Sequence, residues 1–563
     1  MNKFFKILII LALIMGYQNL SAADVSYYVS VYGSNSNLGT ETSPWRTIQY
    51  AVNQCTNSDN DYTIYVAANP IINQNGSGKE YYNENITIGG EGVNFKSLTI
   101  IGPEMEHPPS DFWYDENTDN VVILEKARIH GSITIQKSNV TIENLRIFNT
   151  QATSSTNLIS IASGVSNVMI ETCYIGPLCN TTLTYGFMQK NYNNQWVWAW
   201  VPNGGLNQYY EPWEYENDFQ PAGKHGIYIE GDGYETSNIT IQNSMIYYIS
   251  GEGEGIYLKA PKADETSASV ISNVLLSNNY IMLNRRSGIV AAGEISGLTL
   301  EDNTISLNGW YNDYFGIEDD DNTVTAEYGN GLVLFDGGTN DVSKRSDINV
   351  KSSFYLNRSS GIYLFGGADN VTINNYSDFW DNKDGIFINY TTNEPGHPIG
   401  ITSHYEKNDF TNIKINNNVI HSNRRFGIYY NAKQSDIKCI DAEKNYYDEP
   451  YYIYNGYETG WNGPSTSLGP KYAWGSVDNP TIDGGRDNTN SNSIVYGPVD
   501  INPYMSNLGT GALSNLKVDN SNTSNYFDNI TNALRTLTSC SRDSIVVQGT
   551  STNYSENITI PYA

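Results

Sequence analysis

The sequence predicts an all-β protein, in which a single chain winds into a parallel β-helix with three short strands per coil. A segment of Ser or Asp, then Asn, then alternating apolar residues recurs along the chain, for example at 138–144, 237–243 and 369–375. Equivalent apolar positions recur after as few as 23–24 residues, as in the pairs Val274 and Leu298, Ile348 and Val371, and Ile413 and Ile437. Each period holds three stretches with apolar residues at every second position, which is the spacing of strands. Three strands and three turns per period describe one coil of a parallel β-helix.

Composition and charge exclude several other classes of protein. The chain has 563 residues and a formal net charge of −28, which disfavours nucleic-acid binding because the average field repels a polyanion. Hydrophobic residues make up 39% and charged residues 16%, so the chain is too apolar to be disordered. The 44 Tyr and 49 Gly favour half-buried sheet surfaces and frequent turns over a helical bundle.

Residues 1–23 have the pattern of a secretory signal peptide. A basic start with Lys3 and Lys6 precedes a short apolar run at 7–15, and small residues around Ala22 follow as a cleavage region. The run is too short to span a bilayer, and no other segment has about 18 consecutive apolar residues. We therefore expect bacterial-type export of a mature protein that is secreted or at the cell surface, with no transmembrane segment.

The five cysteines leave at least one thiol free, whatever disulfides form after export. Cys173 and Cys179 are close enough in sequence to pair across a turn. Cys439 lies in a stretch of alternating apolar residues, so we expect a buried thiol there. The spacings of the cysteines match no zinc-site pattern.

Two turns of each coil are predicted to carry a column of Asn or Asp. The first column comprises Asn144, Asn243, Asn278, Asp302 and Asn417. The second column comprises Asn284, Asn308, Asn357 and Asn423. Asn tolerates left-handed backbone, and stacked amides hydrogen-bond to one another, so we expect both columns to be structural.

The two ends of the repeat array differ from the coils. Residues 47–55 carry apolar side chains at helical spacing, which predicts a short helix over the open end of the first coil. The expected divisions are a signal peptide (1–23), an N-terminal cap with the first strand (24–85), the β-helix (86–449) and a closing region with a linker (450–523). Residues 524–563 repeat the register of the N-terminal cap, which predicts the start of a second, truncated β-helix.

These features resemble the right-handed parallel β-helix proteins of the pectin-lyase-like superfamily, in their bacterial secreted form. The resemblance covers roughly residues 24–510, and it includes the opening segments 27–34 and 43–52 and the tail segments 442–448 and 500–504. It implies a right-handed coil with an N-terminal helical cap. It leaves the activity open, because the superfamily includes lyases, hydrolases, epimerases and proteins with no known chemistry.

Two coils carry long insertions between their second and third strands, at 176–224 and 309–330. Because the two coils lie three steps apart, the roots of the insertions are separated by roughly 14 Å on one side. Both insertions combine aromatic residues with carboxylates, which suits a sugar ligand, since its apolar faces stack on rings and its hydroxyls bind polar groups. The candidate sugar-binding residues are Trp196, Trp198, Trp200, Trp213 and Trp310. The alternative is that these aromatic residues only fold the loops onto the coil.

The same turn is basic in the coils that have no insertion. The basic column, which follows the second Asn column and precedes the third strand, comprises Arg285, Arg286, Arg358, Lys383 and Arg424. Arg binds carboxylates through two parallel hydrogen bonds, so this column would hold an anionic polysaccharide along the coil axis. The alternative is a structural pairing with the acidic segment 318–321.

Candidate catalytic residues lie at outward positions near the third strand. Glu230, Asp232 and Lys259, on neighbouring coils, would supply a Lys base for β-elimination or two carboxylates for hydrolysis. Acidic and basic residues on adjacent strands are also ordinary cross-strand neighbours, so the spacing alone does not establish catalysis.

Calcium is the one cofactor that the sequence suggests. The acidic run Glu318, Asp319, Asp320 and Asp321 offers the oxygen ligands that Ca²⁺ prefers. The run lacks the alternating spacing of a dedicated calcium loop, so solvated loop charge is the alternative.

The sequence therefore predicts an exported or cell-surface protein that binds extracellular polysaccharide along the flank with both insertions. One alternative is a polysaccharide lyase or glycoside hydrolase that acts on the same surface. Another is a structural spacer at the cell surface that binds no glycan.

Overall fold

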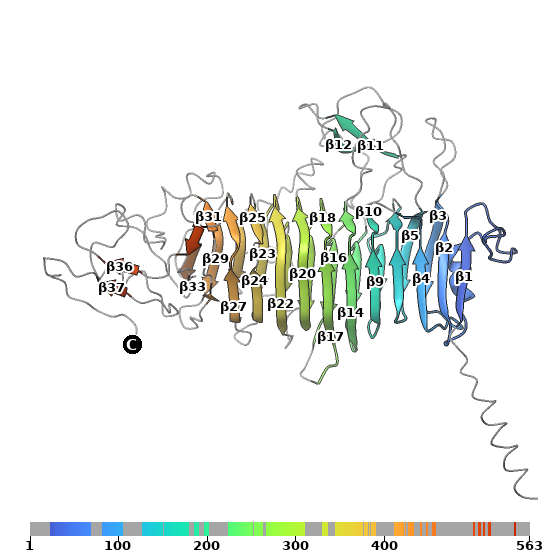
Figure 1. Ribbon diagram of the computed structural model, residues 1–563, viewed down its shortest axis with the longest axis horizontal. Helices are drawn as coiled ribbons and strands as arrows, with labels where there is room; N and C mark the ends of the chain where they lie inside the picture. Colours follow the sequence, from blue (N-terminus) through green and yellow to red (C-terminus); the bar gives the residue numbers. More distant parts are fainter. Residues whose placement is uncertain are drawn as a thin grey trace, which may run out of the picture.

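The computed structural model describes residues 23–432 with several gaps, together with short strands between residues 440 and 547. The gaps are residues 69–80, 105–126, 150, 179–184, 191–195, 202–222, 252, 263–265, 310–328, 336–343, 375–376, 381, 383, 390–409, 422 and 424–425. The described residues form a long stack of strands, arranged in sequence order along the axis (Figure 1).

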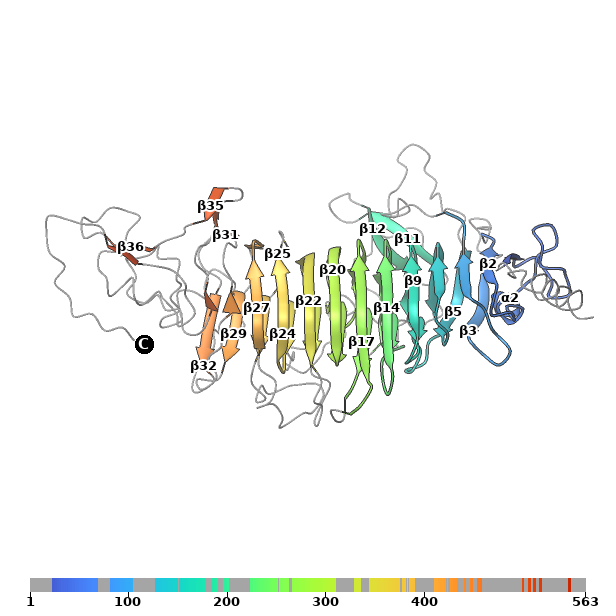
Figure 2. The same ribbon diagram turned by 60° about the horizontal axis from the view of Figure 1, so that its bottom comes forward.

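Each coil contributes up to three strands, and each strand pairs in parallel with its counterpart in the next coil (Figures 1 and 2). The first strands of the coils are β4 (Ser97–Ile101), β6 (Val140–Glu143), β9 (Ser166–Glu171), β14 (Glu235–Gln242), β17 (Val270–Ser277), β20 (Ile295–Ser306), β22 (Arg345–Tyr355), β24 (Ala368–Asn374) and β27 (Phe410–Asn416). The second strands are β7 (Leu145–Asn149), β10 (Tyr174–Leu178), β15 (Met245–Tyr247), β18 (Tyr280–Met282), the ends of β20 and β22, β25 (Asp378–Trp380) and β28 (Val419–His421).

The third strands of the coils form the sheet that carries the candidate site. They are β8 (Ile159–Ile161), β13 (Ile227–Glu230), β16 (Ile256–Ala260), β19 (Ile289–Gly293), β21 (Leu332–Phe335), β23 (Ser360–Phe365), β26 (Asp384–Asn389), β29 (Phe426–Ala432) and β32 (Ile453–Tyr457). The longer β5 (Ala127–Ile135) supplies a second and a third strand in one run. The predicted parallel β-helix is therefore confirmed.

The stack extends beyond these coils at both ends. At the N-terminal end β1 (Asp24–Val29) pairs with β2 (Asp61–Val66), β2 pairs with β4, and β3 (Tyr82–Ile88) pairs with β5. At the other end follow β30 (Ile440–Asp441), β31 (Tyr446–Asp448), β33 (Val499–Asp500), β34 (Met505–Asn507) and β35 (Thr510–Ala512), which is antiparallel to β34. Two further strands, β36 (Leu516–Val518) and β37 (Ile545–Val547), pair with each other in parallel.

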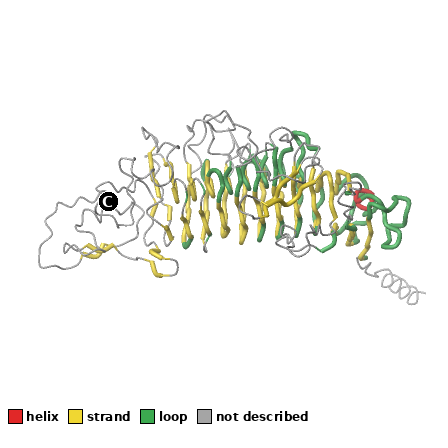
Figure 3. The backbone as a smooth tube through the Cα atoms, turned by 90° about the horizontal axis from the view of Figure 1, so that it is seen from above, coloured by secondary structure: helices red, strands yellow, loops and turns green. Residues whose placement is uncertain are grey.

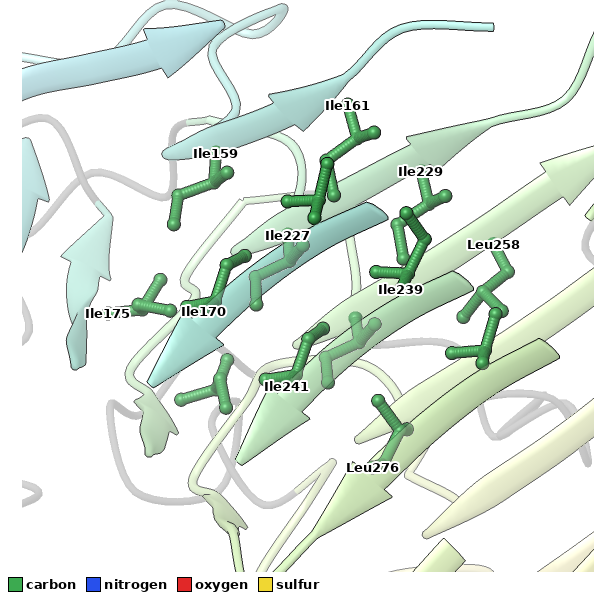
Figure 4. Close-up of a cluster of buried hydrophobic side chains, with 14 of the residues drawn as sticks. Ile159, Ile161, Ile170, Ile175, Ile227, Ile229, Ile239, Ile241, Leu258 and Leu276 are labelled. Carbon is green, nitrogen blue, oxygen red and sulfur yellow. The ribbon is translucent and has the colours of Figure 1, made fainter. Parts of the chain in front are cut away.

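The core is a column of aliphatic side chains from the inward positions of all three sheets. Figure 4 shows Ile159, Ile227, Ile239 and Leu258 pointing into the coil from strands of different sheets, and each is fully buried. The alternation works because neighbouring residues of a strand point to opposite faces, so every second residue enters the core. Burial of apolar surface away from water along this column is the main stabilising contribution to the fold.

The turns confirm the structural roles of both Asn columns. In the first column, Asn144, Asn243, Asn278, Asp302 and Asn417 all have positive φ angles between 51° and 60°. In the second column, the Nδ2 amide of Asn284 donates to Oδ1 of Asn308 at 2.9 Å, and the amide of Asn357 donates to Asn382 at the same distance. Asn382, which the sequence analysis did not name, thus continues the buried ladder toward Asn423.

Glycines allow neighbouring coils to approach closely just before the third strand. A Cβ atom on Gly331 would lie 2.6 Å from the carbonyl oxygen of Gly361, and one on Gly255 would lie 2.6 Å from that of Gly288. A glycine therefore recurs at this place because only glycine fits the space between the coils.

The predicted helical cap is present as α2 (Ile48–Asn53), at the N-terminal end of the stack (Figure 3). Ile48, Ala51, Val52 and Cys55 are all fully buried, as their helical spacing predicted. The carboxylate of Glu84 accepts hydrogen bonds from the backbone N–H groups of Ile48 (2.8 Å) and Gln49 (2.9 Å). This side chain from β3 satisfies donors that the first turn of any helix leaves without a partner.

Cys173 does not form the disulfide with Cys179 that their short separation allowed, because Cys173 is a free, fully buried thiol. Its side chain points into the core, and Sγ lies 3.2 Å from the carbonyl oxygen of Glu171. Cys179 and Cys439 lie outside the described residues. Among the described residues, no helix is long and apolar enough to cross a membrane.

Candidate functional site

The outer face of the third strands is polar and titratable at β13 and β16. Because Ile227 and Ile229 point into the core, Tyr228 and Glu230 point outward, and in the next coil Tyr257 and Lys259 do the same. Tyr228 lies directly opposite Tyr257, and Glu230 lies opposite Lys259, in the parallel register of the two strands.

Two of the three candidate catalytic residues therefore lie side by side. Glu230 accepts a hydrogen bond from the hydroxyl of Tyr228 at 3.2 Å. No ion pair joins Lys259 to Glu230 among the described residues, although the two are register partners. Asp232 lies in the exposed turn after β13, where its charge contributes to the raised pKa of Tyr228.

The structure adds an acid–base pair that the sequence analysis missed. Nδ1 of His225 lies 2.9 Å from Oε2 of Glu254, and the two side chains are only 4% and 13% exposed. The two residues occupy equivalent places, each two positions before the first residue of its strand, β13 or β16. Aligning the repeats by their strand positions would have placed them next to each other, but their contact depends on side-chain conformations that a period does not reveal.

Aromatic rings pack around this pair in a stack along the coil axis. The His225 ring stacks on Tyr257 with centroids 4.6 Å apart and on Tyr228 with centroids 5.5 Å apart. Since the ring faces cover one another, they are not free to stack on a sugar. This stack offers a ligand its edges, with the two tyrosine hydroxyls beside carboxylates.

Burial keeps both tyrosines in the neutral form. The pKa of Tyr228 is raised above 10.0 by burial and by the charge of Glu230. The pKa of Tyr257 is also raised above 10.0, by burial first and then by Glu254, while the charge of Arg286 opposes the shift. Both hydroxyls are therefore hydrogen-bond donors at neutral pH.

The character of the face changes in the coils that follow. From β19 to β26 the outward residues are apolar and buried, and they are Val290, Ala292, Val333, Phe335, Tyr363, Phe365 and Phe387. Tyr257 packs against this apolar cluster. The polar group at β13 and β16 thus lies at the edge of an apolar strip on the same sheet.

The structure places three members of the basic column in turns next to this face. Arg285 and Arg286 precede β19 and are half-buried, and the charge of Arg286 reaches Tyr257. Arg358, before β23, is also half-buried, and its Nη1 lies 3.4 Å from the carbonyl oxygen of Gly309. Lys383, Arg424 and the acidic segment 318–321 lie outside the described residues.

The tryptophan-rich insertion contains an antiparallel hairpin, formed by β11 (Tyr185–Lys190) and β12 (Trp196–Val201). Trp196, Trp198 and Trp200 occupy alternate positions of β12. Trp213 and Trp310 lie outside the described residues.

The calcium proposal rests on Glu318, Asp319, Asp320 and Asp321, which also lie outside the described residues. In the part of the chain that the structure describes, no three His, Cys, Asp or Glu side chains are grouped as a metal site requires.

Comparisons with known proteins support the architecture. Residues 214–349, which include β13 and β16, match the family model described as a right-handed β-helix region. Together with the strand topology, the match makes this a right-handed parallel β-helix protein, which is the fold that the resemblance noted in the sequence implies. No curated protein matches the sequence.

Several solved structures are similar to the chain at low sequence identity. An alginate lyase from Paenibacillus sp. str. FPU-7 is 11% identical, with 77% of this chain and 98% of that chain covered and a TM-score of 0.33. The A-module of a mannuronan C-5 epimerase from Azotobacter vinelandii is 12% identical, with 72% and 84% covered and a TM-score of 0.33. A GH136 lacto-N-biosidase from Eubacterium ramulus is 12% identical, with 80% and 70% covered and a TM-score of 0.37.

Proposed function

We propose that the protein is exported or displayed at the cell surface, where it binds an extracellular anionic polysaccharide along the third-strand face. The observation that carries the proposal is that the face presents the hydroxyls of Tyr228 and Tyr257 between two cations, Arg286, whose charge reaches Tyr257, and Lys259, two residues further along β16. Cations that bind carboxylates and hydroxyls that bind sugar oxygens are the groups that an acidic glycan needs.

The charge of the whole chain makes this grouping informative. With a net charge of −28, random placement would surround most cations with carboxylates. The basic column instead recurs at one turn of successive coils, and coils lie about 4.8 Å apart. Cations in this arrangement match a linear polyanion that runs parallel to the coil axis. The signal-like segment 1–23 supports export of the protein.

A retention screen tests the proposal. The purified protein is applied to immobilised polygalacturonate, alginate and neutral glycans at low salt, and then eluted with a salt gradient. We expect selective retention on the uronate polymers and elution by salt, because exposed ion pairs are screened over a Debye length of about 8 Å at physiological ionic strength. Failure to bind any glycan would contradict the proposal and favour a structural spacer.

An enzyme acting on the same face is the second candidate function. His225 with Glu254, and Tyr228 with Glu230, are the hydrogen-bonded acid–base pairs that favour it. In the same screen, products that absorb in the ultraviolet would identify a lyase, and new reducing ends without that absorption would identify a hydrolase. Retention without turnover would identify a binding protein.

A further inference from the structure

The contact between His225 and Glu254 has two mutually exclusive forms. Nδ1 of His225 lies 2.9 Å from the Oε2 atom of Glu254, and it also lies 3.2 Å from the backbone nitrogen of the same residue. If Nδ1 carries no proton, its lone pair accepts a hydrogen bond from the backbone N–H group. If Nδ1 is protonated, it donates to the carboxylate instead. The geometry is therefore compatible with both protonation states of one ring nitrogen.

The other ring nitrogen has no hydrogen-bond partner among the described residues. Nε2 of His225 is buried, and it makes no hydrogen bond within the described part of the chain. Nε2 carries a proton both in the imidazolium and in the neutral ring whose Nδ1 accepts from the backbone. Leaving this buried donor unsatisfied costs free energy, and the cost is larger when the ring is charged. Such an atom in a native structure calls for an explanation in function or bound solvent.

We propose that His225 and Glu254 form a protonation-dependent recognition point, at which Nε2–H of the imidazolium donates to a carboxylate of the bound glycan. This inference rests on the proposed function and deepens it, since it assigns a regulated contact within the same face. Protonation adds one positive charge beside Tyr257, which the charge of Arg286 also reaches, and the ligand supplies the acceptor that Nε2 lacks. By linkage, a ligand that prefers the imidazolium raises the ring's affinity for the proton, so lower pH and ligand binding reinforce each other.

The other charged groups near the ring do not duplicate this response. Tyr228 on β13 and Tyr257 on β16 stay neutral, because their pKa values are raised. The cations nearby are Lys224, Lys259 and Arg286, and side chains of these types keep their charge well above neutral pH. The carboxylates are Glu230 and Glu254. Histidine is the side chain whose ordinary titration falls between about pH 5 and 8.

The buried position of the ring makes the contact specific. A sugar carboxylate reaches Nε2 only once the edge of the ring is opened to it, and the resulting hydrogen bond is then shielded from water and salt. The arginines of the basic column are more exposed, so they attract the polymer at any pH in this range. His225 would add a contact that depends on pH but little on salt.

The test is the affinity for polygalacturonate between about pH 5 and 8 at constant ionic strength, with its methyl ester as the ligand that lacks carboxylates. For the wild type we expect the affinity to fall by roughly tenfold as pH rises, with a slope of at most one logarithmic unit per pH unit for a single proton. His225→Gln can hydrogen-bond but not titrate, so its affinity should be low and independent of pH. His130→Gln is the matched control, because His130 is a buried histidine on the second-strand face. The affinity of this variant should depend on pH in the same way as that of the wild type.

A second variant guards against misfolding at position 225. Glu254→Gln removes the charge that stabilises the imidazolium, so the fall in affinity should move to lower pH. An unchanged pH profile in His225→Gln, or a wild-type affinity that responds to salt but not to pH, would overturn the inference and leave the proposed function standing. Lack of retention at every pH would overturn both. Equal binding of the methyl ester would also contradict a carboxylate contact.

Discussion

Asn308 donates a hydrogen bond from its side-chain amide to Oδ1 of Asn357 at 2.9 Å, although 49 residues separate the two in sequence. Both side chains are fully buried. The segment 309–330, which the sequence marked as an insertion, lies between them, yet the ladder continues without a break. The coil therefore carries extra chain at this turn while β21 keeps its parallel register with β19 and β23.

Asn308→Ala tests how much the ladder stabilises the fold. The substitution removes the acceptor for the Asn284 amide and the donor to Asn357, and it leaves both partners buried. We expect the free energy of unfolding to fall by about 2–4 kcal/mol in urea denaturation, since each unsatisfied buried group costs about 1–3 kcal/mol. Asn273→Gly is the control, because Asn273 bonds to Asn238 in an exposed ladder at a positive φ that glycine also adopts, and it should cost far less. Equal losses in the two variants would show that burial of the ladder is unimportant.

Two aromatic pairs on the same two coils separate core packing from surface packing. Phe354 and Phe379 stack inside the coil at 5.1 Å, and both are fully buried. Tyr355 and Trp380 stack on the outside at 4.7 Å and are half-buried. We expect Phe354→Ala to lower the free energy of unfolding by about 3–5 kcal/mol, and Tyr355→Ala by only about 1–2 kcal/mol. A larger loss for the outer residue would contradict the assignment of the core.

The repeat explains why the fold was predictable and the site was not. Alternation and the Asn columns place the same kind of residue at the same place in every coil, so many copies support each inference. His225 and Glu254 occur once each, and the equivalent positions in following coils hold Ser287 and Asn330. A contact between two such residues depends on their side-chain conformations and on what packs beside them. The same limitation applies to Glu84. Its hydrogen bond to the cap helix occurs once in the chain, so no repeat pattern predicts it.

Cys173 illustrates an inference in which sequence distance was misleading. The short separation of Cys173 and Cys179 in sequence allowed a disulfide that the structure does not form. Cys173 lies two residues before the buried Ile175 and shares its inward direction, which the alternation could have indicated. Burial raises the pKa of its thiol to about 12, so the thiolate needed for disulfide exchange is scarce.

Glu84 should make stability depend on pH in the acid range. Burial raises the pKa of its carboxyl above 4.5, although the hydrogen bonds from Gln49 and Ile48 act in the opposite direction. The native state therefore binds this proton more tightly than the unfolded state does. Its contribution to the free energy of unfolding falls as pH rises from about 4.5 through the raised pKa. In Glu84→Gln this dependence is lost, which urea denaturation over a series of pH values would detect as a flatter profile than that of the wild type.

Thr47→Ala is the control for this effect. The Thr47 hydroxyl accepts a hydrogen bond from the backbone N–H group of Tyr50 at 3.3 Å and caps the same helix without titrating. We expect a loss of about 1 kcal/mol that is the same at every pH. If Glu84→Gln retained the full acid-range slope of the wild type, another carboxyl would be responsible for it.

The basic column is expected to bind the glycan mainly through charge. Replacing Arg285, Arg358, Lys383 and Arg424 together by Gln should weaken binding of polygalacturonate by roughly 2–4 kcal/mol, if each contact contributes about 0.5–1 kcal/mol and the contacts add. Added salt should weaken binding of the wild type in the same way. Unfolding should change little, because Arg285 and Arg358 are half-buried in turns and do not enter the core. Affinity electrophoresis at two ionic strengths measures both effects.

The rival explanation, a structural pairing of this column with the acidic segment 318–321, predicts the reverse. Glycan retention would then be unchanged in the fourfold variant, and the segment 309–330 would become easier to cleave with protease. Glycan retention and protease cleavage are independent measurements, so they distinguish a column that binds a ligand from one that holds the loop 309–330 by ion pairs. If retention of an acidic glycan changed neither with added salt nor with the fourfold substitution, electrostatic binding along the column would be ruled out. The hairpin that carries Trp196, Trp198 and Trp200 would then be the surface to test next.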